Sequence, residues 1–236
     1  MSLLRRAAGE NARIKNFMYK YFLKRLFDIF FSFIGLVLCL LPFLILMIAI
    51  KIDSKGPVFF LQERVGKNKK IFKIHKFRTM RVDTPHDVPT HLLKNPDEYI
   101  TKVGRFMRKM SLDELPQIWD IFTGKMSIIG PRPALWNQFD LIAARDGYTD
   151  KKGRTVNDIR PGLTGWAQIN GRDELEIPEK ARFDGYYLQN LSFKLDVKCF
   201  FLTFAYVFTR NGVVEGGTGA MGKEHKEQEE KKDGEE

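Results

Sequence analysis

One uninterrupted apolar run dominates the hydrophobic pattern of the chain. Residues 26–50, LFDIFFSFIGLVLCLLPFLILMIAI, contain Asp28 as their only charged side chain. A helix of this length is long enough to cross the hydrocarbon core of a bilayer. The run is longer than the apolar part of a cleaved secretory signal and lacks a small-residue cleavage site. The pattern therefore predicts a membrane-associated helix near the N-terminus.

Pro42 interrupts this run and predicts a bend. A proline removes one helical hydrogen bond, and its ring clashes with the preceding turn. Lysines and arginines flank the run on both sides, which is typical of two ends that lie on the cytoplasmic face. A re-entrant helix over residues 22–52, which returns to the face it entered from, satisfies both observations. A single kinked span and a buried helix of a soluble core are the alternatives.

Short strands and then helices follow the apolar run. Residues 55–80 carry a Gly-Pro turn and β-rich segments, which predict strands and turns. Two helical pieces separated near Ser111 are expected over residues 101–125, and further helices over residues 176–209. The stretch RPGLTGWAQINGR, residues 160–172, has three glycines and a proline and predicts a shaped loop. The expected fold class is α+β, mostly helical with a small strand element.

The charge of the chain narrows the class of partner. The 236 residues carry a formal net charge of +10, and the last 15 contain seven acids and four lysines. The rest of the chain therefore carries about +13 by the same count. Such a body favours nucleic acid, a membrane surface or a phosphate-bearing substrate. Cys39 and Cys199 lie in apolar segments, which indicates buried thiols and no disulfide framework.

The sequence contains no P-loop, no dinucleotide-binding G-x-G-x-x-G, no G-x-S-x-G and no C-x-x-C motif. Its four histidines lack the spacing of metal ligands. The basic residues must therefore serve an anion that is bound in another way.

The stretch SLDELPQ, which begins at Ser111, holds two adjacent carboxylates, Asp113 and Glu114. Pro116 is tolerated only in a first turn, so a helix is expected to begin between Leu112 and Glu114. The free N–H groups of such a start keep a nearby carboxylate ionised and attract phosphates. An ionised carboxylate can act as a nucleophile or as a Mg²⁺ ligand. The alternative is a capping box of Ser111 and Glu114, with no chemical role for Asp113.

Basic residues in other short motifs suit phosphate binding. Lys76 and Arg78 lie two apart in HKFRTM, on one face of an extended segment. Arg108 follows another arginine by three residues, on one face of a helix. Arg132 lies between two prolines in GPRP, which lower the entropy lost in positioning it. Arg172 ends the glycine-rich stretch. The alternatives are a solvated strand face for HKFRTM and a tight turn with a solvated arginine for GPRP.

Together these motifs resemble the bacterial sugar transferases, that is, small monotopic polyprenyl-phosphate glycosyl-1-phosphate transferases. The resemblance covers about residues 20–210. In the family, an asparagine is often found at the position of Asp120, and a serine at that of Leu41. The matching stretches are, in order, KRLFDI, the proline-broken run, GPVFFLQERVG, FKIHKFRTM, SLDELPQIWDIFTGKMSIIGPRP, RPGLTGWAQINGR and YYLQNLSFKLD.

The resemblance implies an enzyme that transfers a sugar-1-phosphate from a UDP-sugar to undecaprenyl phosphate. UMP leaves and undecaprenyl-diphosphate-sugar forms, the first membrane step of exopolysaccharide, O-antigen or glycoprotein glycan synthesis. It implies a ping-pong mechanism in which Asp113, with Glu114 as its partner, becomes a covalent phosphosugar-aspartate. It also implies Mg²⁺ at these two carboxylates. The basic site residues that carry over are Lys76, Arg108, Arg132 and Arg172.

These expectations divide the chain into four parts. A basic N-terminal arm (1–21) precedes the re-entrant helix (22–52), a catalytic domain with interfacial helices (53–210) and a disordered tail (211–236). The expected location is the cytoplasmic face of the bacterial inner membrane, with membrane lipids and no nucleic acid as partners.

Two alternatives remain for the function. The lipid phosphate could attack the UDP-sugar directly, with Asp113 only as a metal ligand, or the chain could be a non-catalytic scaffold of a glycan-assembly complex. The sequence does not name the sugar or the glycan pathway, and it leaves open whether the chain forms a homo-oligomer.

Overall fold

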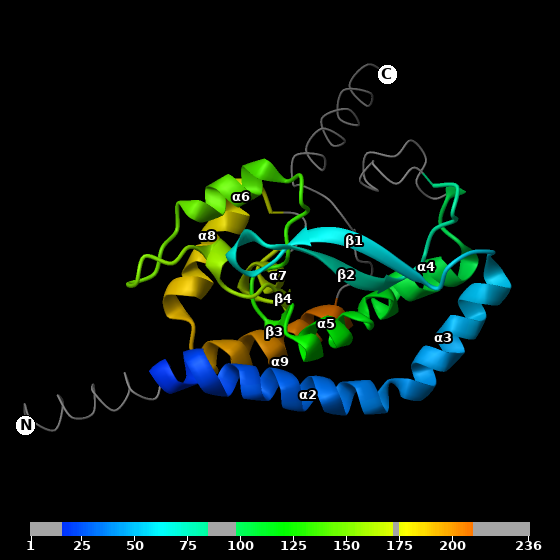
Figure 1. Ribbon diagram of the computed structural model, residues 1–236, viewed down its shortest axis with the longest axis horizontal. Helices are drawn as coiled ribbons and strands as arrows, with labels where there is room; N and C mark the ends of the chain where they lie inside the picture. Colours follow the sequence, from blue (N-terminus) through cyan, green and yellow to red (C-terminus); the bar gives the residue numbers. More distant parts are fainter. Residues whose placement is uncertain (1–15, 85–97, 172–174, 210–236) are drawn as a thin grey trace, which may run out of the picture.

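The computed structural model describes residues 16–84, 98–171 and 175–209, and in these ranges helices surround two small sheets (Figure 1). The α+β expectation is therefore confirmed. Most of the expected N-terminal arm and all of the expected tail lie outside the described residues. The elements are, in chain order, η1 (Tyr19–Leu23), α2 (Lys24–Leu38), α3 (Leu40–Asp53), β1 (Phe59–Val65), η2 (Lys67–Lys69), β2 (Ile71–Phe77), α4 (Lys102–Lys109), η5 (Leu112–Glu114), α5 (Gln117–Thr123), β3 (Ser127–Ile129), α6 (Phe139–Asp146), η6 (Val156–Asp158), β4 (Gly162–Thr164), α7 (Trp166–Ile169), α8 (Ile177–Asn190) and α9 (Phe193–Thr209).

The apolar run forms a bent helix pair. Residues Asn16–Leu38 and Leu40–Asp53 meet at 58°, and only together do they have the length and composition of a membrane segment. Among the described residues, no single helix meets those criteria. The bend lies at Cys39, one turn before the expected position at Pro42. A proline ring crowds the carbonyl four residues earlier, which here is that of Leu38. A causal role for Pro42 remains a prediction.

The two sheets are small and differ in direction. Strands β1 and β2 form an antiparallel hairpin, in which Phe59 pairs with Phe77 and Val65 with Ile71. Strands β3 and β4 are parallel. The glycine-rich stretch expected to be a loop thus contains β4 and the single turn α7. Glycine explains this difference, because a Cβ on Gly162 would lie 2.1 Å from the main-chain nitrogen of Gly130.

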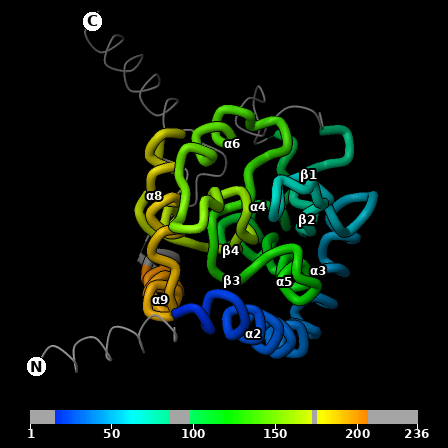
Figure 2. The backbone as a smooth tube through the Cα atoms, turned by 60° about the vertical axis from the view of Figure 1, so that its left-hand side comes forward, coloured from blue at the N-terminus to red at the C-terminus, as the bar shows by residue number. Residues whose placement is uncertain are grey.

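The bent pair shares the core of the molecule on its inner side. Leu46 and Ile50 of α3 are buried with Phe77 of β2 and Met107 of α4. Large apolar residues of α2 and α3 are exposed, and α9, which lies beside α2 (Figures 1 and 2), carries further ones. We call this set the apolar outer surface; it comprises Leu26, Phe30, Phe33, Val37, Leu41, Leu44, Ile45, Ile48, Ile52, Phe200, Phe201 and Phe204.

Polar side chains on the inner face of α2 bind the rest of the molecule. Arg25 donates to the carbonyls of Ile121 and Phe122 at the end of α5, at 2.6 and 2.8 Å. Asp28, which is 4% exposed, accepts from the Ile128 N–H at 2.9 Å and the Ser127 hydroxyl at 3.1 Å. These contacts join the apolar run to α5 and β3.

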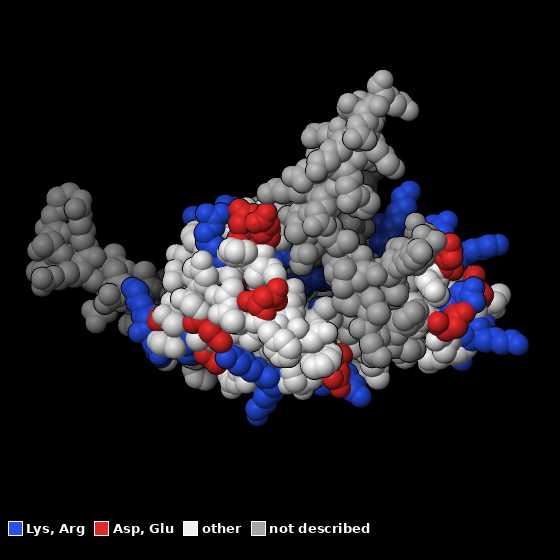
Figure 3. Space-filling model, turned by 90° about the horizontal axis from the view of Figure 1, so that it is seen from above, with Lys and Arg blue, Asp and Glu red and all other residues white. Residues whose placement is uncertain are grey.

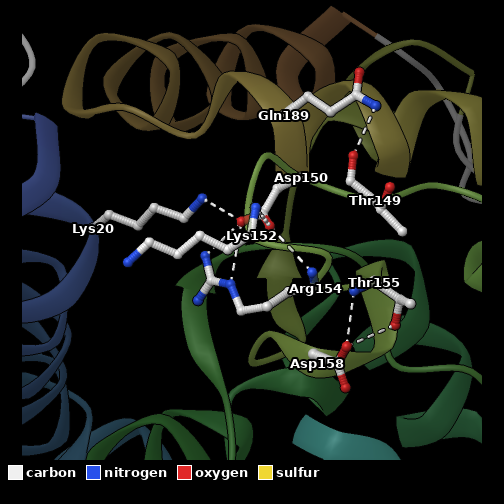
Figure 4. A network of polar contacts seen from close by, with 8 residues as sticks. All are labelled: Lys20, Thr149, Asp150, Lys152, Arg154, Thr155, Asp158 and Gln189. Atoms are coloured by element: carbon white, nitrogen blue, oxygen red, sulfur yellow. Dashed lines mark hydrogen bonds and ion pairs between the residues drawn. The ribbon is translucent and has the colours of Figure 1, made fainter.

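A second polar network joins η1 to the loop after α6 (Figure 4). The carboxylate of Asp150 accepts from Lys20 at 3.0 Å and from Arg154 at 2.8 Å. The ammonium of Lys152 lies 4.6 Å from the ring centre of Tyr21. The N-terminal end of the bent pair is therefore bound to the rest of the molecule as well.

We predict that Asp28→Ala lowers the stability of the protein. The substitution leaves the Ile128 N–H and the buried Ser127 hydroxyl without this acceptor, and a buried unsatisfied group costs about 1–3 kcal/mol. Thermal unfolding of the purified protein in detergent measures the loss. Asp28→Asn is the control, because its side-chain oxygen still accepts; equal losses in both variants would contradict the assignment.

Candidate active site

The two adjacent carboxylates lie in a short 3-10 turn. Ser111 adopts a left-handed conformation with φ of 54°, and η5 follows it directly. A 3-10 helix thus begins where a helix start was expected, whereas the α-helix α5 begins only at Gln117. Asp113 and Glu114 are 3% and 8% exposed. The Ser111 side chain makes no capping hydrogen bond, so the capping-box alternative is wrong.

Two cations from different elements hold Glu114. Lys76, near the end of β2, donates to its Oε1 at 3.0 Å. Arg132, in the turn after β3, donates to Oε1 at 2.6 Å and to Oε2 at 3.3 Å. Burial by itself would raise the pKa of Glu114, but the charges of Arg132 and Lys76 outweigh it and hold the pKa well below its ordinary value. The structure therefore brings together four of the residues singled out in the sequence, namely Lys76, Asp113, Glu114 and Arg132.

The other predicted basic residues lie differently. Arg108 of α4 donates to the Thr79 hydroxyl at 2.9 Å, just beyond the end of β2. Arg78 is buried and donates to the carbonyls of Pro57 and Ser54, at 2.6 and 2.9 Å. It thus supports the connection between α3 and β1, and its role as a phosphate ligand remains a prediction. Arg172 lies outside the described residues.

Sequence reasoning did not identify His75 as a partner of Asp120. Asp120 is 0% exposed and accepts from the His75 main-chain N–H at 2.9 Å, while its other oxygen lies 2.8 Å from His75 Nδ1. This contact fixes the edge of β2 on α5, one residue before Lys76. No local sequence pattern relates the two residues, because they lie 45 positions apart and meet only when α5 packs against β2.

Asp113 and Glu114 are adjacent carboxylates, and carboxylate oxygens are ligands that Mg²⁺ accepts. The described residues contain no group of three or more His, Cys, Asp and Glu side chains that could enclose a metal ion. Mg²⁺ in phosphoryl-transfer sites is commonly held by one or two carboxylates together with substrate phosphates. Asp113 and Glu114 can supply that part of a ligand set.

Seen from above, lysine and arginine side chains, drawn in blue, lie along the rim of the molecule, and some blue atoms are recessed near its middle (Figure 3). The site as a whole contains a buried carboxylate pair and several fixed cations. Such an arrangement can bind a diphosphate and offer it a carboxylate nucleophile.

Comparisons with known proteins match most of the chain. A family model described as bacterial sugar transferase covers residues 19–210. The chain is 42% identical over 195 residues to the uncharacterized sugar transferase EpsL of Bacillus subtilis (strain 168). This alignment covers 81% of the chain and 90% of EpsL.

Two further relatives have names that describe a reaction. The chain is 41% identical over 187 residues to the UDP-glucose:undecaprenyl-phosphate glucose-1-phosphate transferase of Escherichia coli (strain K12). It is 38% identical over 200 residues to the undecaprenyl-phosphate glucose phosphotransferase of Komagataeibacter xylinus. These alignments cover 77% and 80% of this chain but 39% and 36% of the two relatives. The chain therefore matches less than half the length of either enzyme.

We predict that Glu114→Gln destabilises the protein at neutral pH and much less in acid. Because the folded-state pKa of Glu114 lies below its ordinary value of 4.5, its ionised form stabilises the fold above that pH. The stabilisation is lost as the pH falls through the folded-state pKa. Melting temperatures of the wild type and the variant, measured from pH 7 to pH 3, should therefore converge toward low pH.

Glu63→Gln, at an exposed position of β1, is the control and should behave like the wild type. The prediction would be contradicted if the difference in melting temperature between Glu114→Gln and the wild type stayed constant over this pH range.

Proposed function

Because the chain belongs to the bacterial sugar transferase family, we propose that it transfers a sugar-1-phosphate from a UDP-sugar to undecaprenyl phosphate. The observation that carries the proposal is the buried pair Asp113 and Glu114, with Glu114 bound by Lys76 and Arg132. The names of the relatives from Escherichia coli and Komagataeibacter xylinus support both undecaprenyl phosphate and a sugar phosphate as substrates.

The first step is an attack by a carboxylate oxygen of Asp113 on the phosphorus that carries the sugar. A new oxygen–phosphorus bond forms, the bond to the bridging oxygen of the diphosphate breaks, and UMP leaves with the electron pair. In this proposal Lys76 and Arg132 stabilise the charge on the transferred phosphoryl group. Their contacts with Glu114 keep these cations in place before the substrate binds.

The second step regenerates the carboxylate. A phosphate oxygen of undecaprenyl phosphate attacks the same phosphorus, and Asp113 leaves with the electrons of its bond. Undecaprenyl-diphosphate-sugar is the product, so the protein proceeds by a ping-pong mechanism. Asp113 and Glu114 would hold Mg²⁺, which neutralises charge on the diphosphate when it is bound.

The apolar outer surface supports a location on a membrane. Monomeric soluble proteins rarely expose apolar patches of this extent. The lipid substrate brings its phosphate to the interface, so an enzyme whose bent helix pair lies in the bilayer can reach that phosphate. Phe106 of α4, Met110 directly after α4 and Trp119 of α5 are large apolar side chains that are exposed as well. We therefore propose a re-entrant helix pair at the cytoplasmic face of the bacterial inner membrane.

We predict that Asp113→Asn abolishes a covalent intermediate. Wild-type protein incubated with a UDP-sugar labelled in the sugar, without lipid acceptor, should retain the label after denaturation and release UMP. The amide of the variant is a poor nucleophile, so the label should be absent. A panel of UDP-sugars identifies the substrate, and Asp140→Asn, at an exposed position in α6, is the control.

The alternatives give different results in the same assay. Direct one-step transfer predicts no label and no UMP until the lipid acceptor is added. A non-catalytic scaffold predicts no turnover with any UDP-sugar, and glycan assembly that is unaffected by Asp113→Asn.

We predict that both ends of the bent helix pair face the same side of the membrane. Single cysteines at Asn16 and Lys55, introduced into a variant without Cys39 and Cys199, should react with an impermeant thiol reagent from the cytoplasmic side only. Asn16 is the first residue of the pair, Lys55 lies just after its end, and both are exposed. Reaction from opposite sides would establish a single kinked span and contradict the re-entrant arrangement.

A further inference from the structure

The segment that carries Arg132 is fixed through its main chain. Prolines 131 and 133 have no N–H to donate, so only carbonyls can hold them. Four successive carbonyls each accept a hydrogen bond from a different residue. The carbonyl of Pro131 accepts from the Gly162 N–H at 2.8 Å, and that of Arg132 accepts from the Arg145 side chain at 2.9 Å. The carbonyl of Pro133 accepts from the Arg64 side chain at 3.0 Å, and that of Ala134 accepts from the Val65 N–H at 2.9 Å.

The bond to the Arg132 carbonyl comes from a buried ion pair. Arg145 of α6 is 5% exposed, and its Nη2 atom donates both to that carbonyl and to Asp184 Oδ2, the latter at 2.6 Å. Its Nε atom donates to the same carboxylate oxygen at 2.9 Å. Asp184 lies on α8 and is 1% exposed. Direct contacts therefore run from Asp184 through Arg145 and Arg132 to Glu114.

This ion pair is poorly suited to serve stability alone. Asp184 Oδ1 has no hydrogen-bond partner among the described residues, and burial raises the pKa of Asp184 although the charge of Arg145 opposes the rise. Replacing a buried ion pair by apolar residues of similar volume is often neutral or stabilising. The contact between α6 and α8 has an apolar core of its own, in which Leu141 and Ala181 pack with Val65 and Ala134.

We propose that Arg145, oriented by Asp184, is a positioning residue for the transfer reaction. It fixes the main chain at Arg132 so that the guanidinium group meets Glu114 and the phosphates of the substrate. This inference rests on the proposed function. Arg145 and Asp184 lie 39 positions apart in the sequence. In the contacts described above, neither touches Asp113 or Glu114.

The double variant Arg145→Met/Asp184→Leu tests the inference, because it removes both charges and leaves neither unpaired. In detergent with undecaprenyl phosphate and the preferred UDP-sugar, its kcat/KM for UMP release should fall on the order of 10²-fold, as for a small misplacement of a catalytic group. Its melting temperature should stay near that of the wild type. Arg182→Gln, which removes the exposed pair with Glu179 on α8, should leave both unchanged.

A second measurement separates positioning from general damage. In an Arg132→Lys background, where the paired contact with Glu114 is already lost, the double variant should reduce kcat/KM little further. Substitutions that act through one contact show such non-additive losses. The fold-losses in kcat/KM of independent substitutions multiply instead. If the double variant does not fold, Asp184→Asn replaces it, because this variant keeps the shape and one acceptor oxygen and should show a smaller loss with the same non-additivity.

Three results decide between the possibilities. The positioning role would be overturned if the double variant had the kcat/KM of the wild type. It would also be overturned if the double substitution lowered kcat/KM by the same factor in the Arg132→Lys background as with Arg132 intact. In both cases the proposed function would stand. An active wild type with the expected non-additive loss supports it. A wild-type protein that releases no UMP from any UDP-sugar would overturn the proposed function, and this inference with it.

Discussion

The ion triad of Lys76, Glu114 and Arg132 is the interaction on which the rest of the structure depends. Its members come from β2, η5 and the turn after β3, so the triad forms only when all three have folded into place. Burying one carboxylate between two cations avoids the large cost of an unpaired buried charge. In the proposed reaction it also prepares the site for an anionic substrate, because both cations are held in place before any substrate arrives.

Much of this site could be predicted from the sequence, because its residues belong to short motifs with a local geometry. Asp113 and Glu114 lie in one turn, and the prolines around Arg132 restrict that turn whatever the surroundings are. Arg78 shows the limit of such reasoning. Alternation along a strand places it on the same side as Lys76, but β2 ends at Phe77, so the rule no longer fixes the direction of the next side chain.

Contacts between segments that lie far apart along the chain could not be predicted from the sequence. Arg145 and Asp184 are ordinary helical residues until α6 and α8 pack together, and no local pattern relates them. Strand β4 has only three residues, and it forms because glycines allow β3 and β4 to approach. Similarly, the apolar run showed an unusual length but gave no sign that Arg25 and Asp28 would bind α5 and β3.

These bonds between α2 and the rest of the molecule have a mechanical consequence. A free membrane helix adapts to a bilayer of different thickness by tilting. Helix α2 is bonded to α5 and β3 by Arg25 and Asp28, and α3 shares a core with β2 and α4, so the bent pair cannot tilt without carrying Asp113 with it. If the apolar outer surface lies in lipid, the depth to which it sinks sets the height of Asp113 above the hydrocarbon. In the proposed reaction, bilayer thickness then controls how closely Asp113 and the lipid phosphate approach each other.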